Sequence, residues 1–254
     1  MTEVNAPALE VEHLSFHVGG LALTNDVSLK IERGERRALM GPNGAGKTTL
    51  LNLIAGLIRP SEGCVRLDGR DVTSLSAHRM ARAGVARTFQ VTNLLPTHTV
   101  AENLALAVTS DHRGRRNPGR PWRRMAEVWD VVDGLITQGG LASVAKTPVS
   151  ELPYGTQRKL EIVVSVARPA SVVLLDEPGA GLSTVEAEEL IELVFDLGPH
   201  IAVVFIDHDV ELVLKLATSV TVLDLGCVVA EGTPAEMRES SVFEEIYMGA
   251  AAHA

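Results

Sequence analysis

A glycine-rich phosphate-binding pattern constrains the fold of this chain more than any other feature of the sequence. The pattern GxxxxGK[ST] is matched without exception by Gly41, Pro42, Asn43, Gly44, Ala45, Gly46, Lys47 and Thr48. An apolar run at 37–40 precedes the pattern and helix-spaced leucines follow it, so the loop is expected between a strand and a helix. Backbone N–H groups, the Lys47 ammonium and the helix dipole then all face phosphate oxygens. The pattern predicts binding of ATP or GTP, with Thr48 as a magnesium ligand and Thr49 among the nucleotide-binding residues.

Two carboxylates follow a second apolar run further along the chain. The run at 172–175 is continuous and β-rich, as is the run at 201–206, which predicts strands of a parallel sheet buried on both faces. Asp176 and Glu177 come directly after the first run, at the sheet edge where α/β proteins bind ligands. Alternation points them in different directions. We expect Asp176 at a magnesium ion and Glu177 at an attacking water.

The composition, net charge and cysteine content of the chain argue against several other classes of protein. The 254 residues are 46% hydrophobic and 22% charged, which predicts a sizeable core, and a net charge of -9 argues against a broad nucleic-acid-binding surface. The only two cysteines, Cys64 and Cys227, lack metal-ligand spacing. A disulfide between them is a weak possibility, and a reducing, intracellular compartment is the favoured interpretation. We expect neither a secretory signal nor a membrane span, since no segment has the roughly 18–20 uncharged apolar residues that a span needs.

The remaining patterns outline the organisation of the chain. Alternating segments at 9–16 and 26–32 predict N-terminal strands, and 220–230 reads as a hairpin followed by a capping box at Thr233. From about 90 to 159 the pattern is mostly helical, interrupted by a loop that is rich in arginine, glycine and proline. A solvated insertion is the favoured interpretation of this loop, and contact with lipid headgroups or nucleic acid is the alternative.

The segment 152–157 (LPYGTQ) resembles the LSGGQ signature of ATP-binding cassette (ABC) proteins. Its leucine and second glycine match, and Gln157 matches a glutamine that often follows, whereas Pro153, Tyr154 and Thr156 differ from that pattern. Other segments follow the family order: 86–90 (ARTFQ) resembles the Q-loop and 179–183 (GAGLS) the D-loop, and His208 matches the switch histidine.

This resemblance implies a head-to-tail pair of subunits around two ATP molecules. Each ATP would lie on the Lys47 loop of one subunit and be covered by Gly155, Thr156 and Gln157 of the other. Glu177 would act as general base or orient water, and His208 would contact the γ-phosphate. Gln90 would bridge the metal, the attacking water and a transmembrane permease, which would dock on 91–103.

More narrowly, the segment 152–162 (LPYGTQRKLEI) is similar to the ATPases of branched-chain amino acid importers. In that group an aromatic residue usually stacks on adenine, and by the resemblance its position is occupied here by Val18. Phe16 either takes over the stacking role or is simply a core residue. A second departure is Val164, where the family usually has an arginine. These departures allow weaker nucleotide binding or slower hydrolysis.

The predicted fold is α/β: a P-loop NTPase core with a mostly parallel sheet, an N-terminal antiparallel β subdomain and an inserted helical subdomain. We expect the core at 1–90 and 160–240, the helical subdomain at 91–159 with the arginine-rich loop at 111–124, and a tail at 241–254.

The expected function is the ATP-hydrolysing subunit of a transporter that imports branched-chain amino acids or related small polar solutes. Its expected cofactors are ATP and Mg²⁺, and its expected partners are permeases, a second ATPase subunit and a solute-binding protein, with no specific nucleic acid. The expected location is cytoplasmic, on the inner face of the cell membrane. The alternatives are a soluble non-transport cassette ATPase and a lipid or lipopolysaccharide exporter subunit.

Overall fold

The computed structural model describes residues 6–88, 94–111, 123 and 125–240. The chain divides into two compact units. The first unit comprises residues 1–87, 170–180 and 198–254, and the second comprises residues 88–169 and 181–197. Neither unit contains, in its described residues, a helix long and apolar enough to cross a lipid bilayer.

A six-stranded, mostly parallel sheet forms the centre of the first unit. Its order is β10 (Cys227–Gly232), β9 (Ser219–Asp224), β3 (Arg36–Met40), β8 (Ala202–Ile206), β7 (Val172–Asp176) and β6 (Val85–Arg87). Strands β6, β7, β8, β3 and β9 pair in parallel, and β10 closes the predicted hairpin with β9. Every residue of β7 and β8 is buried, which confirms the parallel strands predicted from uninterrupted apolar runs.

A second, antiparallel sheet is built from the N-terminal strands. Its order is β2 (Leu21–Ile31), β1 (Leu9–Val18), β4 (Glu62–Leu67) and β5 (Arg70–Asp71). The pairing of β1 with both neighbours shifts register near His13, whose backbone is left-handed with φ of 49°. This sheet confirms the predicted antiparallel N-terminal part.

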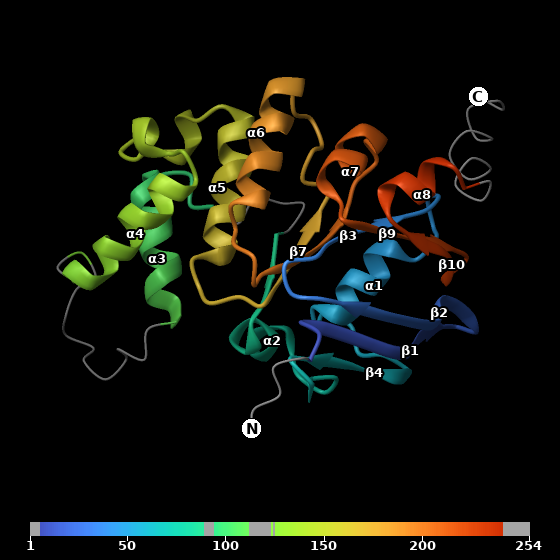
Figure 1. The fold of residues 1–254 in the computed structure, drawn as a ribbon. Coiled ribbons are helices and arrows are strands. Elements are labelled where there is room, and N and C mark those ends of the chain that lie inside the picture. The colour runs from blue at the N-terminus through green and yellow to red at the C-terminus, as the bar shows by residue number, and fades with distance from the viewer. Residues whose placement is uncertain (1–5, 89–93, 112–122, 124, 241–254) are drawn as a thin grey trace. The chain divides into compact units, whose positions relative to one another are not determined.

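Helix α1 (Lys47–Ile54) joins the two sheets of the first unit into one core. Its buried Leu50, Leu51 and Ile54 share a hydrophobic cluster with residues of both sheets, and Figure 1 shows the helix between them. The short helices α2 (Ala77–Ala83) and α8 (Pro234–Arg238) belong to the same unit, as does α7 (Val210–Leu216), which lies on the face of the six-stranded sheet opposite α1 (Figure 1). The predicted capping box at Thr233 is present at the start of α8.

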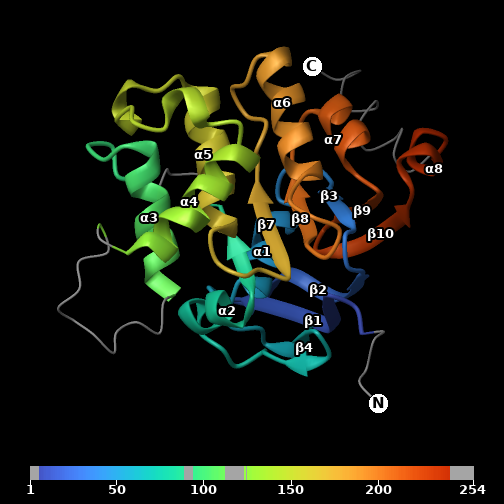
Figure 2. The ribbon, with the colours of Figure 1, turned by 60° about the vertical axis from the view of Figure 1, so that its left-hand side comes forward.

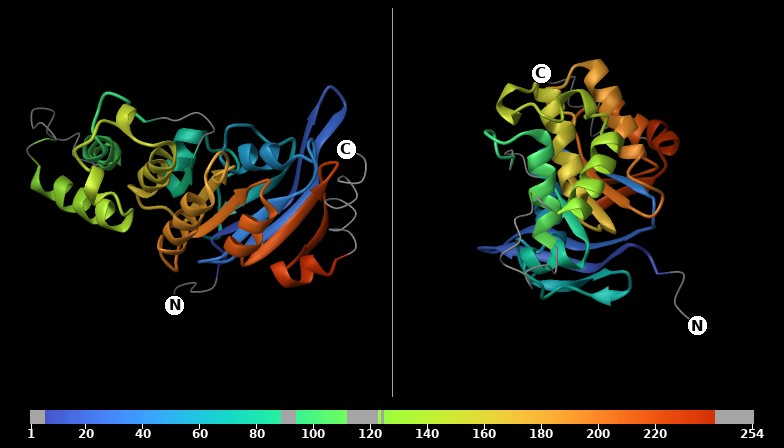
Figure 3. Two further views of the ribbon diagram at one scale, coloured as in Figure 1. Left: turned by 90° about the horizontal axis from the view of Figure 1, so that it is seen from above. Right: turned by 90° about the vertical axis from the view of Figure 1, so that its left-hand side faces the viewer.

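The second unit is helical. Its described residues form α3 (Val100–Asp111), α4 (Ala126–Gln138), α5 (Tyr154–Val166) and α6 (Thr184–Phe195), together with the 3-10 turns η3 (Ala142–Val144) and η4 (Val149–Glu151). Helix α4 buries Val128, Val132, Leu135 and Ile136, the spacing of one helical face. Helices α3 and α5 lie side by side, as Figures 2 and 3 show.

The two units differ from the domain limits expected from the sequence. Helix α5 and the separate segment 181–197, which carries α6, belong to the helical unit rather than to a core that resumes at 160. The physical reason is that α6 buries Leu190, Leu193 and Val194 and packs against α5. Most of the predicted arginine-rich loop at 111–124 and the predicted tail at 241–254 lie outside the described residues.

Candidate functional site

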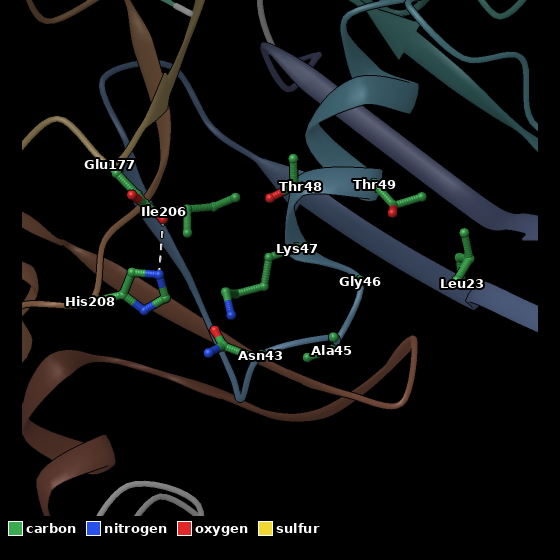
Figure 4. Close-up of a pocket in the computed structure, with 11 residues that line it drawn as sticks. Leu23, Asn43, Ala45, Gly46, Lys47, Thr48, Thr49, Glu177, Ile206 and His208 are labelled. Atoms are coloured by element: carbon green, nitrogen blue, oxygen red, sulfur yellow. Dashed lines mark hydrogen bonds and ion pairs between the residues drawn. The ribbon is translucent and has the colours of Figure 1, made fainter. Parts of the chain in front are cut away.

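A pocket of about 250 Å³ opens where the phosphate loop faces the ends of β7 and β8 in the first unit. It is lined by Leu23, Asn43, Gly44, Ala45, Gly46, Lys47, Thr48, Thr49, Glu177, Ile206 and His208. Figure 4 shows Glu177 and His208 on one side of the pocket, the loop across from them, and Leu23 beyond the loop. The structure therefore brings together residues of the phosphate loop, the acidic strand end and the predicted switch segment.

Two glycines of the phosphate loop are required by close packing. Gly41 has φ of 141° and Gly46, which precedes α1, has φ of 96°. A Cβ at Gly41 would overlap the carbonyl oxygen of Leu223, and one at Gly46 would overlap that of Leu23. The loop thus turns tightly against two strands and directs the N-terminus of α1 into the pocket, the arrangement that suits an anion.

Lys47 is the cation inside this loop. Its side chain is buried, and Nζ donates hydrogen bonds to the carbonyl oxygens of Gly41 (2.6 Å) and Pro42 (2.9 Å). Burial lowers the pKa of the Lys47 ammonium, and the Glu177 carboxylate acts in the opposite direction. Both bonds are to neutral acceptors, so a phosphate group offers Lys47 the stronger, charge-assisted contact.

Glu177 and His208 form a hydrogen-bonded pair at the wall of the pocket. The His208 Nε2 and Glu177 Oε1 atoms are 2.9 Å apart (Figure 4). Glu177 has a left-handed backbone, with φ of 50°, and its N–H donates to the Ile206 carbonyl at 2.8 Å. A non-glycine residue in this region is strained by about 1–3 kcal/mol, and such strain clusters at functional sites. The pair has the geometry of a general base and the group that orients it.

Asp207 ties the segment after β7 to the segment after β8. This buried carboxylate accepts hydrogen bonds from the N–H groups of Gly179 (2.8 Å) and Asp209 (3.0 Å). A Cβ on Gly179 would lie 2.5 Å from the Leu212 side chain, which explains the glycine there. The contact holds the Glu177 and His208 backbones in a fixed relation.

Asp176 lies at the end of β7 and is buried. The Arg87 Nη2 atom lies 3.2 Å from its Oδ2, and Arg87 Nη1 donates to Asn52 Oδ1 at 2.6 Å. Asp176 and Thr48 offer carboxylate and hydroxyl oxygens, the donors that Mg²⁺ prefers, and the guanidinium shows that a cation is accommodated at Asp176. The residues present therefore fit the magnesium ion predicted from the sequence.

The predicted signature residues lie in the second unit, at the start of α5. Gly155 is buried, and a Cβ there would overlap the Glu186 side chain, the capping residue of α6. Hydrogen bonds from Ser183 and from the Gly155 backbone lower the pKa of the Glu186 carboxyl. The Gln157 side chain turns back to the Leu152 carbonyl at 3.0 Å. Gly155, Thr156 and Gln157 thus occupy a helix N-terminus, as the sequence predicted.

Some expected site residues take other places. Gln90 lies outside the described residues. Val18 is 53% exposed at the end of β1 and is not among the residues that line the pocket, whereas Leu23 on β2 is. Phe16 packs against the hydrophobic core, in line with the core interpretation.

Sequence reasoning missed three residues of the site region. Leu23 and Ile206 line the pocket, and Arg87 pairs with Asp176. Ile206 ends an apolar run, and this position in the sequence could have indicated that it lies at the pocket. A leucine in an alternating strand and an arginine after a short apolar stretch carry no comparable signal.

Known proteins resemble this chain over most of its length. The model of the ABC transporter family matches residues 24–180. The chain is 34% identical to the high-affinity branched-chain amino acid transport ATP-binding protein BraF of Pseudomonas aeruginosa, over 98% of this chain and 100% of the relative. It is 36% identical to the corresponding protein LivG of Salmonella typhimurium, over the same shares.

Solved structures share the fold. A nucleotide-free ATP-binding cassette from an ABC transporter superposes with a TM-score of 0.81 at 25% identity, covering 94% of this chain and 98% of that one. The ADP conformation of the cassette MJ1267 also gives a TM-score of 0.81, at 24% identity, covering 96% of this chain and 100% of that one.

Proposed function

The chain belongs to the ABC transporter family, whose ATPases hydrolyse ATP to power transport, and from that premise we propose that Glu177 and His208 are its catalytic pair. The contact of 2.9 Å between His208 and Glu177, in a pocket shared with the phosphate loop, carries this proposal. Among the described residues that line the pocket, Glu177 is the only carboxylate and His208 the only imidazole.

The phosphate loop provides the binding energy. Lys47 exchanges its two carbonyl partners for the terminal phosphates, and the N–H groups at the start of α1 hold phosphate oxygens. Gly41, Pro42, Asn43, Gly44, Ala45, Gly46, Thr48 and Thr49 form the rest of the phosphate cradle. Thr48 and Asp176 would hold Mg²⁺, with Gln90 as a further ligand, and the ion neutralises phosphate charge when bound.

Glu177 acts on the attacking water. Its carboxylate accepts a proton from the water or orients it toward the γ-phosphorus, and His208 fixes the direction of that carboxylate through Nε2. Glu177 has a left-handed backbone, and its side chain meets His208 at the wall of the pocket. Since phosphoryl transfer depends mainly on positioning and charge, this pair and Lys47 account for most of what the protein contributes.

The active assembly is a head-to-tail dimer. Gly155, Thr156 and Gln157 cover the γ-phosphate of the ATP bound to the other subunit, with the N-terminus of α5 directed at the anion. The segment 91–103 docks a transmembrane permease on the inner face of the cell membrane. In the part of this segment that is described, Asn103 fixes the turn by donating to the carbonyl oxygens of Leu95, His98 and Thr99.

The transported solute is a branched-chain amino acid or a related small polar molecule, delivered by a solute-binding protein. The support is the near-complete coverage of BraF and LivG, which are named as branched-chain amino acid transport ATP-binding proteins. The signature variant at 152–157, with tyrosine before glycine, agrees with that group.

The catalytic assignment is tested by Glu177→Gln. This variant should bind ATP and form a stable ATP-bound dimer, while steady-state phosphate release falls by at least about a hundredfold, because general-base catalysis contributes about that much. Phosphate release and gel filtration with ATP and Mg²⁺ measure the two effects. Glu211→Gln, an exposed glutamate in the first turn of α7, is the matched control. Rapid turnover by Glu177→Gln would refute the role.

The transport assignment is tested in a strain that lacks the gene. Uptake of labelled leucine should be lost, restored by the wild-type chain and not restored by Glu177→Gln, and a permease should copurify with the tagged chain. Leucine uptake that is unchanged in the deleted strain would contradict the proposed solute class and leave the ATPase assignment standing.

A further inference from the structure

Arg87 is the buried arginine that pairs with Asp176, the proposed magnesium position. The Arg87 side chain is 9% exposed and that of Asp176 is 4% exposed, so both charges are nearly removed from water. A buried carboxylate without a cation is strongly unfavourable. The contact of 3.2 Å therefore places a positive charge directly beside the buried Asp176 carboxyl group.

The position of Arg87 is fixed by its place in the fold. It is the last residue of β6, which pairs in parallel with β7 so that Arg87 lies opposite Leu174, two residues before Asp176. Its second terminal nitrogen donates to Asn52 on α1, the helix that begins at Lys47. Arg87 thus connects the end of β7 to the phosphate-loop helix.

Burial lowers the pKa of the Arg87 guanidinium, and Asp176 acts in the opposite direction. Arginine nevertheless stays charged in proteins. A divalent cation bound at the same carboxylate would then have a like charge beside it, and like charges at such range weaken each other's binding.

We propose that Arg87 is the resident counter-ion of Asp176, a positioning residue that stabilises the metal-free subunit and opposes binding of the divalent cation. The guanidinium and the metal compete for one carboxylate. This inference rests on the proposed function, because it assigns the metal to Asp176.

The test compares nucleotide affinity with and without metal. Fluorescent ADP is titrated into each variant with Mg²⁺ or with EDTA. The dissociation constant in EDTA divided by the dissociation constant in Mg²⁺ gives a ratio that rises as the metal contributes more to binding. Arg87→Met, which keeps most of the side-chain volume, should raise this ratio about tenfold over wild type, since a neighbouring charge shifts the affinity of an ionisable site by about that factor or more. Arg87→Lys should stay near the wild-type ratio.

Arg37→Met is the matched control. Arg37 is also a buried arginine of the first unit, paired with Glu35 and Glu231, but it lies on β3 rather than beside Asp176. Both methionine variants should lower the melting temperature of the metal-free protein. On adding ADP and Mg²⁺, only Arg87→Met should show a larger rise in melting temperature than wild type shows.

The outcomes separate this inference from the proposed function. If wild type binds ADP but Arg87→Met leaves the ratio unchanged or lowers it, the counter-ion role is wrong. If wild type and Lys47→Ala bind ADP equally, the proposed nucleotide site is wrong. Should Arg87→Met not fold, the double variant Arg87→Met with Asp176→Asn should fold because the buried charge is gone, and its failure to fold would overturn the inference.

Discussion

At the scale of single residues, the site depends on a few side chains that differ in how visible they are in the sequence. Lys47 and Thr48 belong to a contiguous pattern, so their place in the pocket was predictable. The residue that stacks on adenine could not be predicted from a contiguous pattern in this way. Val18 is exposed beside the turn between β1 and β2, and the aliphatic Leu23 faces the pocket instead.

An aromatic residue at position 18 should strengthen nucleotide binding. Stacking a base on an aromatic ring contributes about 1–3 kcal/mol, so Val18→Phe should lower the dissociation constant for fluorescent ADP by about tenfold. His17→Phe, one residue earlier on the other face of β1, is the control and should leave it unchanged. Equal affinities for Val18→Phe and wild type would place the base elsewhere.

At the scale of elements, helix α5 carries a buried ion pair with an incomplete set of partners. The Arg158 Nη1 atom is 2.8 Å from Glu161 Oε2, and both side chains are almost fully buried. Among the residues that the structure describes, none hydrogen-bonds to the buried Oε1 of Glu161. Val164 follows Glu161 by three residues, on the same helical face. The arginine expected at 164 from the family would therefore have met this carboxylate.

Val164→Arg should stabilise the protein. A hydrogen bond from a charged group to a buried carboxylate contributes about 1.5 kcal/mol, which corresponds to a melting temperature about 3–6 °C higher in a chain of this size. Thermal unfolding measures the change, and Val164→Met, which adds length without charge, should show no such rise. A melting temperature at or below that of Val164→Met would mean that Glu161 gains no partner.

At the scale of the whole molecule, the two units carry different parts of the proposed site. The phosphate loop, Glu177 and His208 belong to the first unit, and Gly155, Thr156 and Gln157 belong to the second. In the proposed head-to-tail dimer, each composite site takes one set of residues from each subunit. Two inactive variants with lesions in different sets can therefore form one intact site together.

Mixing Lys47→Ala with Gly155→Asp should restore hydrolysis. Each variant alone spoils both sites of its homodimer, whereas a mixed dimer keeps one site with an intact loop and an intact signature. With random pairing, an equal mixture should reach about one quarter of wild-type phosphate release. The matched control is Lys47→Ala mixed with Glu177→Gln, whose lesions affect the same side of the site. No activity in the first mixture would contradict the head-to-tail arrangement.

The sequence alone determined the phosphate loop, the buried parallel strands and the order of the remaining motifs. These depend on contiguous residues whose types dictate backbone turns, burial and charge, so they can be read without knowing what lies nearby. The same holds for the capping box at Thr233 and for Asp176 and Glu177 at a strand end.

Only the tertiary structure decided which groups meet. Arg87, Asn52 and Asp176 come from β6, α1 and β7, and their contacts form only after the sheet pairs and α1 packs against it. The 2.9 Å contact of Glu177 with His208 joins the segments that follow β7 and β8, which lie 31 residues apart in the sequence. Pairing between distant segments is set by the packing of the whole core, and no local pattern contains it.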